Sequence, residues 1–343
     1  MSDGGGLGRE REREQKARAP HPQKARGLGA PHPLSLSLSL SLFLSLPLPL
    51  SPSPGDPAFD ASFTNVYTHP ALAAIPWYAT LGNHDYGPVE GPRAEAAADG
   101  GAPLTPLPEE CAGESPCQYG PLPQLGSGLM ARDPRWHAWR GASLVPTGPA
   151  AERAGGIEFF FFDTSPAVKS YRKEVWANNP GGLVEQSPAG NLAELEASMA
   201  ASTAKWRLVV AHHPPSGLRV PSRAPGLDAE VCPVAAAGGA AAFLSGHEHL
   251  LAFIARPAGP CAAVPQITSG SGGAVDSKPF VPNPGVAVTP GTAWWQGLDA
   301  GFVECAISSA SMACDWWGTD TAAGPLYSAV VKPPAGVGGG KGA

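Results

Sequence analysis

Three apolar runs in this 343-residue chain each end in a polar, histidine-containing motif. "IPWYATL" leads into Gly-Asn-His-Asp at 82–85, "RLVVA" leads into His-His at 212–213, and "AAFLS" leads into Gly-His-Glu-His at 246–249. Each run predicts a buried strand, and functional groups in α/β sheets collect at the carboxyl ends of strands. One such motif alone is more typical of a turn or a strand end. Because all three follow apolar strands, we expect them to meet at one sheet edge and form a site.

The side chains of these motifs indicate metal binding. Neutral imidazole suits Zn, Fe, Mn or Cu, and the amide oxygen of Asn83 suits a hard cation. His247 and His249 are two residues apart, so on a strand they would share a face, whereas on a tight loop they could reach two neighbouring ions. The pattern therefore predicts a metal centre with ligands from three strand ends.

The remaining chain alternates between helix and strand signals. A helix is expected after Asp56, its N-cap, with Phe59, Phe63 and Val66 on one face, and a second helix is expected to open at Asn191. The stretch 87–130 is interpreted as a Gly/Pro-rich loop, and "DAEVCPVAAAGG" as a possible helix. Further strands are expected in "IEFFFFDTS", "LLAFIARP", "PQITSGSGG", "AGFVECAIS", "MACDWW" and "PLYSAVVK". Helices among the early strands and a strand-rich second half predict a layered α/β domain.

The chain is divided into three segments by its composition. Residues 1–55 contain "REREREQKAR" and a strict Leu/Ser alternation, residues 56–333 form the expected domain, and the Gly/Ala/Lys tail 334–343 is expected to be disordered. Leu-Ser and Arg-Glu repeats are what CT and GA dinucleotide repeats encode. We therefore favour translated repetitive DNA or a disordered tail for the first segment. A targeting segment, and a part of the fold, are the two alternatives left open.

Charge and cysteine content exclude some functions. The net charge of −6 gives no electrostatic basis for nucleic-acid binding. The Leu/Ser run is too short and serine-rich for a stable membrane span, and it shows no convincing signal peptide. Six cysteines without a CxxC pair do not form a zinc ribbon, and their even number permits disulfides without requiring them.

The motifs "GNHDY", "VVAHHPP" and "LSGHEH" resemble the later sequence blocks of the calcineurin-like metallophosphoesterases. The resemblance is closest to small purple acid phosphatases of the tartrate-resistant type. It extends to "FFDTS", "QITSGSGG" and "AGFVECAIS" and covers roughly residues 57–332. It implies an αββα sandwich of two mixed sheets flanked by helices, here lacking its first strands.

The resemblance also implies roles for individual residues. Asn83, His212 and His247 would bind a divalent metal, His249 would bind a neighbouring ion, Fe(III) in the purple enzymes, and His84 would protonate the leaving oxygen. The implied cofactor is a binuclear centre of Fe with Zn, Mn or Fe, and the implied reaction is hydrolysis of a small phosphomonoester.

Two further residues have secondary expectations. His213 is a possible substrate contact, and Asp85 would orient His84.

The sequence departs from the family pattern before residue 82. The family's DxG and GDNxY motifs, which supply a terminal Asp, a bridging Asp and a Tyr, have no clear counterpart here. Asp56 is a weak substitute, because the preceding "SPSP" is no strand and the residue serves better as a helix cap. We therefore expect about one divalent ion in this chain and an impaired acid phosphatase activity.

Two alternatives remain at this stage. One is a non-catalytic remnant of the fold, and the other is a calcineurin-like phosphodiesterase or protein phosphatase. The resemblance implies a secreted or vacuolar-type location, which the residues themselves do not indicate.

Overall fold

The computed structural model describes most of the chain after residue 58 and one short stretch before it. The described residues are 35–36, 59–73, 75–87, 121–125, 127–178, 181–216, 218, 224–257, 259–272, 275–276 and 294–334. All of them belong to one compact unit, Pro33–Ala343. Asp56, almost all of segment 1–55 and the tail after residue 334 lie outside the described residues.

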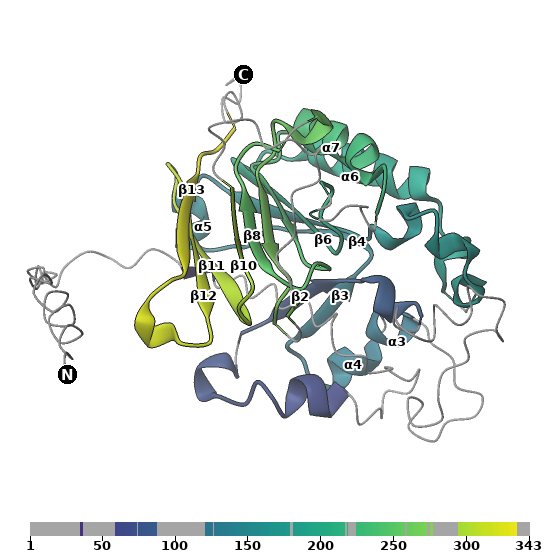
Figure 1. Cartoon of the computed structure of the whole chain (residues 1–343), viewed down its shortest axis with the longest axis horizontal. Helices are drawn as coiled ribbons and strands as arrows, with labels where there is room; N and C mark the ends of the chain where they lie inside the picture. Colours follow the sequence, from purple (N-terminus) through teal and green to yellow (C-terminus); the bar gives the residue numbers. More distant parts are fainter. Residues whose placement is uncertain are drawn as a thin grey trace, which may run out of the picture. The chain divides into compact units, whose positions relative to one another are not determined.

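A seven-stranded mixed sheet forms the centre of this unit (Figure 1). Its order is β10 (Trp294–Gly297), β8 (Leu251–Ile254), β9 (Gln266–Ser269), β7 (Ala242–Ser245), β6 (Trp206–Ala211), β5 (Ile157–Phe162) and β4 (Gly141–Leu144). Strands β5, β6, β7 and β9 are parallel neighbours, whereas β4, β8 and β10 pair antiparallel. The predicted motifs at 212–213 and 246–249 therefore follow adjacent parallel strands.

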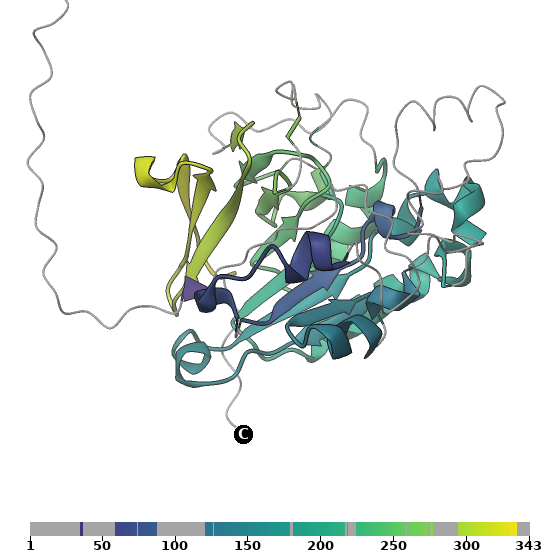
Figure 2. The same cartoon turned by 90° about the horizontal axis from the view of Figure 1, so that it is seen from below.

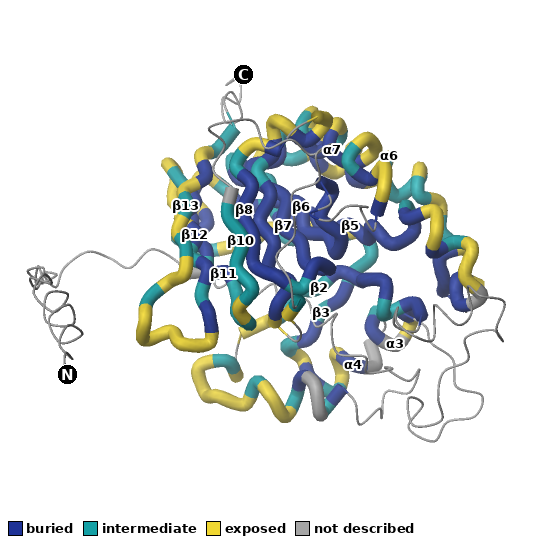
Figure 3. Tube along the Cα trace, viewed as in Figure 1, coloured by how far each residue is buried: buried dark blue, intermediate teal, exposed yellow. Residues whose placement is uncertain are grey.

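The central strands β5, β6 and β7 of the seven-stranded sheet are buried on both faces, which explains why their residues are mostly apolar. Phe160 and Val209 pack with helices α6 (Pro188–Ala201) and α7 (Leu227–Ala237) in one core cluster. Their neighbours Phe161 and Val210 belong to a second cluster on the opposite face. In Figure 3 the traces of β6 and β7 are dark blue, whereas α6 and α7 expose their outer residues.

The second cluster is closed by a four-stranded antiparallel sheet, so two sheets form a sandwich. Its order is β1 (Ser35–Leu36), β11 (Gly301–Ile307), β12 (Met312–Gly318) and β13 (Tyr327–Val331). Alternate residues of β11, such as Val303 and Ile307, face the core. Figure 2 shows these yellow strands beside the green and teal strands of the first sheet. The predicted α/β sandwich with a central mixed sheet is confirmed, although the described strands of the second sheet are antiparallel and not mixed.

The Leu/Ser segment contributes the two described residues of β1. Ser35 pairs with Ala306, and Leu36 pairs with Cys305. At these two residues the segment therefore takes part in the second sheet, where few contacts were expected.

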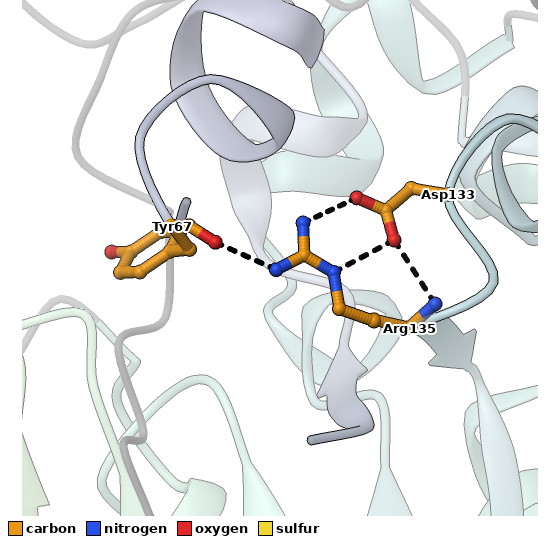
Figure 4. Close-up of polar contacts among 3 residues, drawn as sticks. All are labelled: Tyr67, Asp133 and Arg135. Carbon is orange, nitrogen blue, oxygen red and sulfur yellow. Dashed lines mark hydrogen bonds and ion pairs between the residues drawn. The ribbon is translucent and has the colours of Figure 1, made fainter. Parts of the chain in front are cut away.

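A small parallel sheet carries the first predicted motif. Strand β2 (Trp77–Thr80) pairs with β3 (Trp136–Trp139), which follows α3 (Leu122–Leu125) and α4 (Ser127–Arg132). Phe59, Phe63 and Trp136 form its core. Arg135 fixes the segment before β2, because its guanidinium binds the Asp133 carboxylate and donates to the Tyr67 carbonyl at 2.7 Å (Figure 4).

The expected helix after Asp56 forms only in part. A five-residue π-type turn spans Asp60–Thr64, and a 3-10 turn spans Pro70–Leu72. His69 precedes a proline, which disfavours helical backbone, and its ψ is 134°. The turn ends before Val66, which was expected in the core and is 54% exposed, whereas Phe59 and Phe63 are buried as predicted.

Other differences concern short elements. Helix α6 begins at Pro188 with Ser187 as N-cap, three residues before the predicted start. Within 87–130, interpreted as loop, α3 and α4 are helical, and residues 88–120 lie outside the described part. The prediction omitted β3, β4, β10, α5 (Pro149–Arg153) and the 3-10 turns at Asn83–Asp85, Ser165–Ala167, Tyr171–Lys173, Val175–Asn178, Leu183–Glu185, Gly259–Cys261 and Thr321–Ala323.

Two disulfides join parts of the described chain. Cys232 of α7 is bonded to Cys261, and Cys305 of β11 is bonded to Cys314 of β12. None of the helices in the described part has the length and apolarity that a membrane crossing requires.

Candidate metal centre

The strand ends meet as the sequence predicted for α/β sheets. β6 and β7 are parallel neighbours, and the Gly246 N–H donates to the His212 carbonyl at 3.0 Å, which joins the two loops. Asn83 reaches the same place from the 3-10 turn after β2. Three segments far apart in the chain therefore share one buried site.

Three potential ligand atoms are in direct contact. His212 Nε2 lies 2.7 Å from Asn83 Oδ1 and 3.0 Å from His247 Nδ1. These side chains are 1%, 5% and 6% exposed, respectively. Neighbouring ligand atoms at right angles around an ion with bonds of ~2.1 Å would be ~3.0 Å apart, so the spacing fits a small divalent cation.

The protonation state of His212 also fits this role. Burial lowers the pKa of His212 well below its usual value, and His213, His84 and His249 lower that pKa further. The imidazole is therefore neutral at physiological pH, as a metal ligand must be. The same interactions show that His84 and His249 lie near His212, and both are half-buried.

The loop that carries His247 is tightly constrained. His247 has φ 63°, a left-handed conformation that is uncommon outside glycine. Gly270 packs against this loop so closely that a Cβ at Gly270 would lie 1.9 Å from the Glu248 carbonyl oxygen. Such backbone geometry is maintained only by surrounding structure, and here it directs His247 Nδ1 toward His212.

Asp85 holds the turn that carries Asn83. Its Oδ2 accepts the Gly82 N–H at 2.6 Å, and its Oδ1 accepts from the Gln124 side chain of α3. Burial raises the pKa of Asp85 to about 6, although both hydrogen bonds oppose that shift. Both carboxylate oxygens of Asp85 thus accept a hydrogen bond, from Gly82 and from Gln124, and the orientation of His84 by Asp85 stays a prediction.

His213 belongs to the cluster, and both of its ring nitrogens lie close to protein hydroxyls. Nδ1 lies 2.8 Å from Thr164 Oγ1, and Nε2 lies 3.2 Å from the Tyr171 hydroxyl. The possible substrate contact that the sequence assigned to His213 stays a prediction. Thr164 and Tyr171 had no role in the sequence prediction, although Thr164 lies in "FFDTS", one of the segments that carry the family resemblance.

The neighbourhood of His249 contains fewer ligands. The His249 N–H donates to Asp276 Oδ2 at 3.0 Å, and the Asp276 N–H donates to the His249 carbonyl at 2.9 Å. Among the residues that the structure describes, the one group of three or more His, Cys, Asp or Glu ligands is His212, His213 and His247. His249 is not a member of that group.

A buried Asp–Tyr pair lies next to the site and was missed by sequence reasoning. The Tyr86 hydroxyl donates to Asp163 Oδ2, and the Gln186 side chain donates to the same hydroxyl at 2.9 Å. Burial raises the pKa of Asp163 to about 7. Both residues lie within quoted segments, Tyr86 at the end of "GNHDY" and Asp163 in "FFDTS" directly after β5, but neither was assigned a role.

Comparison with known proteins matches these observations. The family model described as "Calcineurin-like phosphoesterase" matches residues 55–251. Purple acid phosphatase 17 of Arabidopsis thaliana is 31% identical over 67% of this chain and 57% of its own length. Purple acid phosphatase 4 of the same plant is 31% identical over 63% of this chain and 52% of its own length. The chain thus spans just over half the length of these relatives.

One solved structure has a similar fold. It is described as GAP50, the anchor in the inner membrane complex of Plasmodium, and the match has a TM-score of 0.55 at 15% identity. The match covers 83% of this chain and 75% of that chain. At this identity the likeness concerns the fold alone.

Proposed function

Because the chain belongs to the calcineurin-like phosphoesterase family, we propose that it hydrolyses small phosphomonoesters at a metal centre held by Asn83, His212 and His247. The observation that carries the proposal is the contact of Asn83 Oδ1, His212 Nε2 and His247 Nδ1 at the ends of three strands. One amide oxygen and two neutral imidazoles suit a divalent ion such as Zn²⁺ or Mn²⁺.

In the proposed hydrolysis, the metal ligands, His84 and Asp85 have different roles. A divalent ion bound here would polarise a phosphoryl oxygen and lower the pKa of bound water. His84 stands on the same turn as Asn83, so its imidazolium can deliver a proton to the leaving alcohol oxygen. Asp85 holds that turn through Gly82, which keeps Asn83 and His84 in a constant relation to each other.

The second ion of the family's binuclear centre has weaker support. His249 would be its ligand, but the described residues near His249 do not include a three-ligand cluster. Asp56, the weak substitute, lies outside the described residues. We therefore propose about one divalent ion per chain and a slow acid phosphatase. The same observation favours a second candidate, a non-catalytic binding protein with this fold.

An oxidising compartment, secreted or vacuolar, is part of the proposal. It is supported by the disulfides Cys232–Cys261 and Cys305–Cys314, since such bonds persist mainly outside the reducing cytosol.

Metal content and turnover of p-nitrophenyl phosphate test the proposed function. Zn²⁺ and Mn²⁺ should bind with a stoichiometry of about one ion per chain, because one three-ligand site is present. His247→Ala should abolish tight binding and whatever turnover is seen, whereas His69→Asn at an exposed turn should change neither. Metal binding without turnover would select the non-catalytic candidate. Two tightly bound ions with fast turnover would refute the one-ion centre, and binding unaffected by His247→Ala would refute the ligand assignment.

A further inference from the structure

We propose that His213 is a positioning residue, clamped by the hydroxyls of Thr164 and Tyr171, that holds the two ligand rings His212 and His247 in place without touching metal or substrate. The inference rests on the proposed metal centre, and it assigns a function to a buried histidine, a threonine and a tyrosine that the reaction itself does not use.

The first step is the hydrogen-bonding of the His213 ring. Thr164 Oγ1 accepts the His213 backbone N–H at 3.1 Å and lies 2.8 Å from Nδ1, while the Tyr171 hydroxyl lies 3.2 Å from Nε2. In a neutral imidazole one nitrogen donates and the other accepts. In either tautomer of His213, the hydroxyl beside the unprotonated nitrogen can donate to it, and the other hydroxyl can accept from the ring N–H. Both ring nitrogens are therefore engaged by protein hydroxyls, although a nitrogen of this ring lies within 4.8 Å of the candidate ligand atoms of His212 and His247.

The second step is the packing of the three rings. The His213 centroid lies 4.5 Å from that of His212 and 4.3 Å from that of His247. His213 and Thr164 are fully buried, and Tyr171 is 5% exposed. The clamped ring thus fills the space beside both ligand rings and limits their rotation. Groups that orient metal ligands typically change metal affinity by 10–100-fold when they are removed.

The third step is the origin of the clamp. Thr164 follows β5, and Tyr171 lies in the 3-10 turn Tyr171–Lys173 of the same connection, whereas His213 follows β6. Because β5 and β6 are parallel neighbours, the clamp transmits the rigidity of the sheet to the ligand rings. Tyr171 is itself packed on Trp176, with centroids 5.8 Å apart.

The test measures Co²⁺ affinity and the visible spectrum of the Co²⁺-loaded full chain. Thr164→Val and Tyr171→Phe should each weaken Co²⁺ binding about tenfold, with the spectrum retaining its ligand set. Thr268→Val is the matched control, because it also removes a buried hydroxyl, here one that bonds Ser245 of the neighbouring strand. The Co²⁺ affinity of this control should stay within about twofold of the wild-type affinity. Thermal unfolding without metal checks that every variant is folded.

A double variant tests whether Thr164 acts through His213. In a His213→Gln background, adding Thr164→Val should cause little further loss of affinity, because coupled residues are not additive. Unchanged Co²⁺ affinity in Thr164→Val and Tyr171→Phe would overturn the clamp while leaving the metal centre intact. A ligand-field change in His213→Gln that indicates a lost nitrogen ligand would overturn it too. A wild-type chain that binds no Co²⁺ would instead refute the proposed metal centre, and the clamp with it.

Discussion

At the residue scale, Asp163 is a buried acid whose pKa is raised far above its ordinary value. It is 1% exposed, its Oδ1 accepts the Ser165 N–H at 2.9 Å, and its Oδ2 accepts the Tyr86 hydroxyl. These bonds and the charge of Arg140 favour the carboxylate, yet burial outweighs them and raises the pKa to about 7. The folded protein thus keeps a proton on Asp163 at pH values where the unfolded chain has released it.

This shift predicts a sign for the pH dependence. Between the ordinary pKa of 3.8 and about 7, the folded state binds more protons at Asp163 than the unfolded state does. The contribution of Asp163 to the free energy of unfolding must therefore fall as pH rises through that window and become constant above it. The free energy of unfolding of wild type, minus that of Asp163→Asn, should decrease from pH 4 to pH 7 in urea titrations.

Asp133→Asn provides the control for this measurement. Hydrogen bonding by Arg135 lowers the pKa of Asp133, so the contribution of Asp133 to the free energy of unfolding is lost only in acid. The free energy of unfolding of wild type, minus that of Asp133→Asn, should therefore be constant between about pH 5 and 8. Parallel wild-type and Asp163→Asn curves from pH 4 to 7 would contradict the assigned shift.

At the element scale, the position of β2 depends on the Arg135 fork. The guanidinium bonds Asp133 through two nitrogens and reaches the Tyr67 carbonyl with a third, and it lies 5.0 Å over the Phe63 ring. Arg135 and Asp133 are only 13% and 6% exposed at their side chains. One side chain therefore joins the segment before β2 to the segment before β3.

Replacing that fork should destabilise the chain measurably. Arg135→Lys cannot keep all three directed bonds, so we expect the free energy of unfolding to fall by about 1–3 kcal/mol. Arg132→Lys, at the more exposed pair with Asp60, should cost less than about 1 kcal/mol. Chemical denaturation of both variants gives the comparison, and equal losses would show that the Tyr67 bond contributes little.

At the scale of the whole molecule, the two disulfides close loops of different length. Cys232–Cys261 links α7 to the connection between β8 and β9 across 29 residues, whereas Cys305–Cys314 closes 9 residues within β11 and β12. From the loop-closure entropy that each bond removes from the unfolded chain, we expect the longer loop to raise the free energy of unfolding by about 3.6 kcal/mol and the shorter one by about 2.6 kcal/mol. The Cys232–Cys261 disulfide should therefore stabilise the folded chain more than Cys305–Cys314 does.

Paired alanine variants test this ranking. Cys232→Ala with Cys261→Ala should lower the melting temperature more than Cys305→Ala with Cys314→Ala. All four cysteines are 0–1% exposed, so the cavities left by the two double variants are matched. A larger drop for the short-loop pair would indicate that the β11–β12 hairpin, and not chain entropy, dominates.

Much of the site could be predicted from the sequence because its signals are local. Asn83, His212 and His247 each follow an apolar run, and strand ends of parallel neighbours meet at one sheet edge. The layered α/β sandwich followed for the same reason, since strands buried on both faces are continuously apolar. The expected loss of family motifs before residue 82 concerns mainly residues 1–58, of which the structure describes only two, so it remains a prediction.

Tertiary structure alone decided how the polar groups pair. Asp85 bonds Gln124 39 residues later, Tyr86 bonds Asp163 across 77 residues, and His213 bonds Thr164 across 49. No local period reports such pairs, because each depends on which loops the sheet order brings together. The sequence therefore determined which side chains could bind a metal. Only the packing of β5 against β6 brought the His213 ring nitrogens to the hydroxyls of Thr164 and Tyr171, which is the basis of its proposed positioning role.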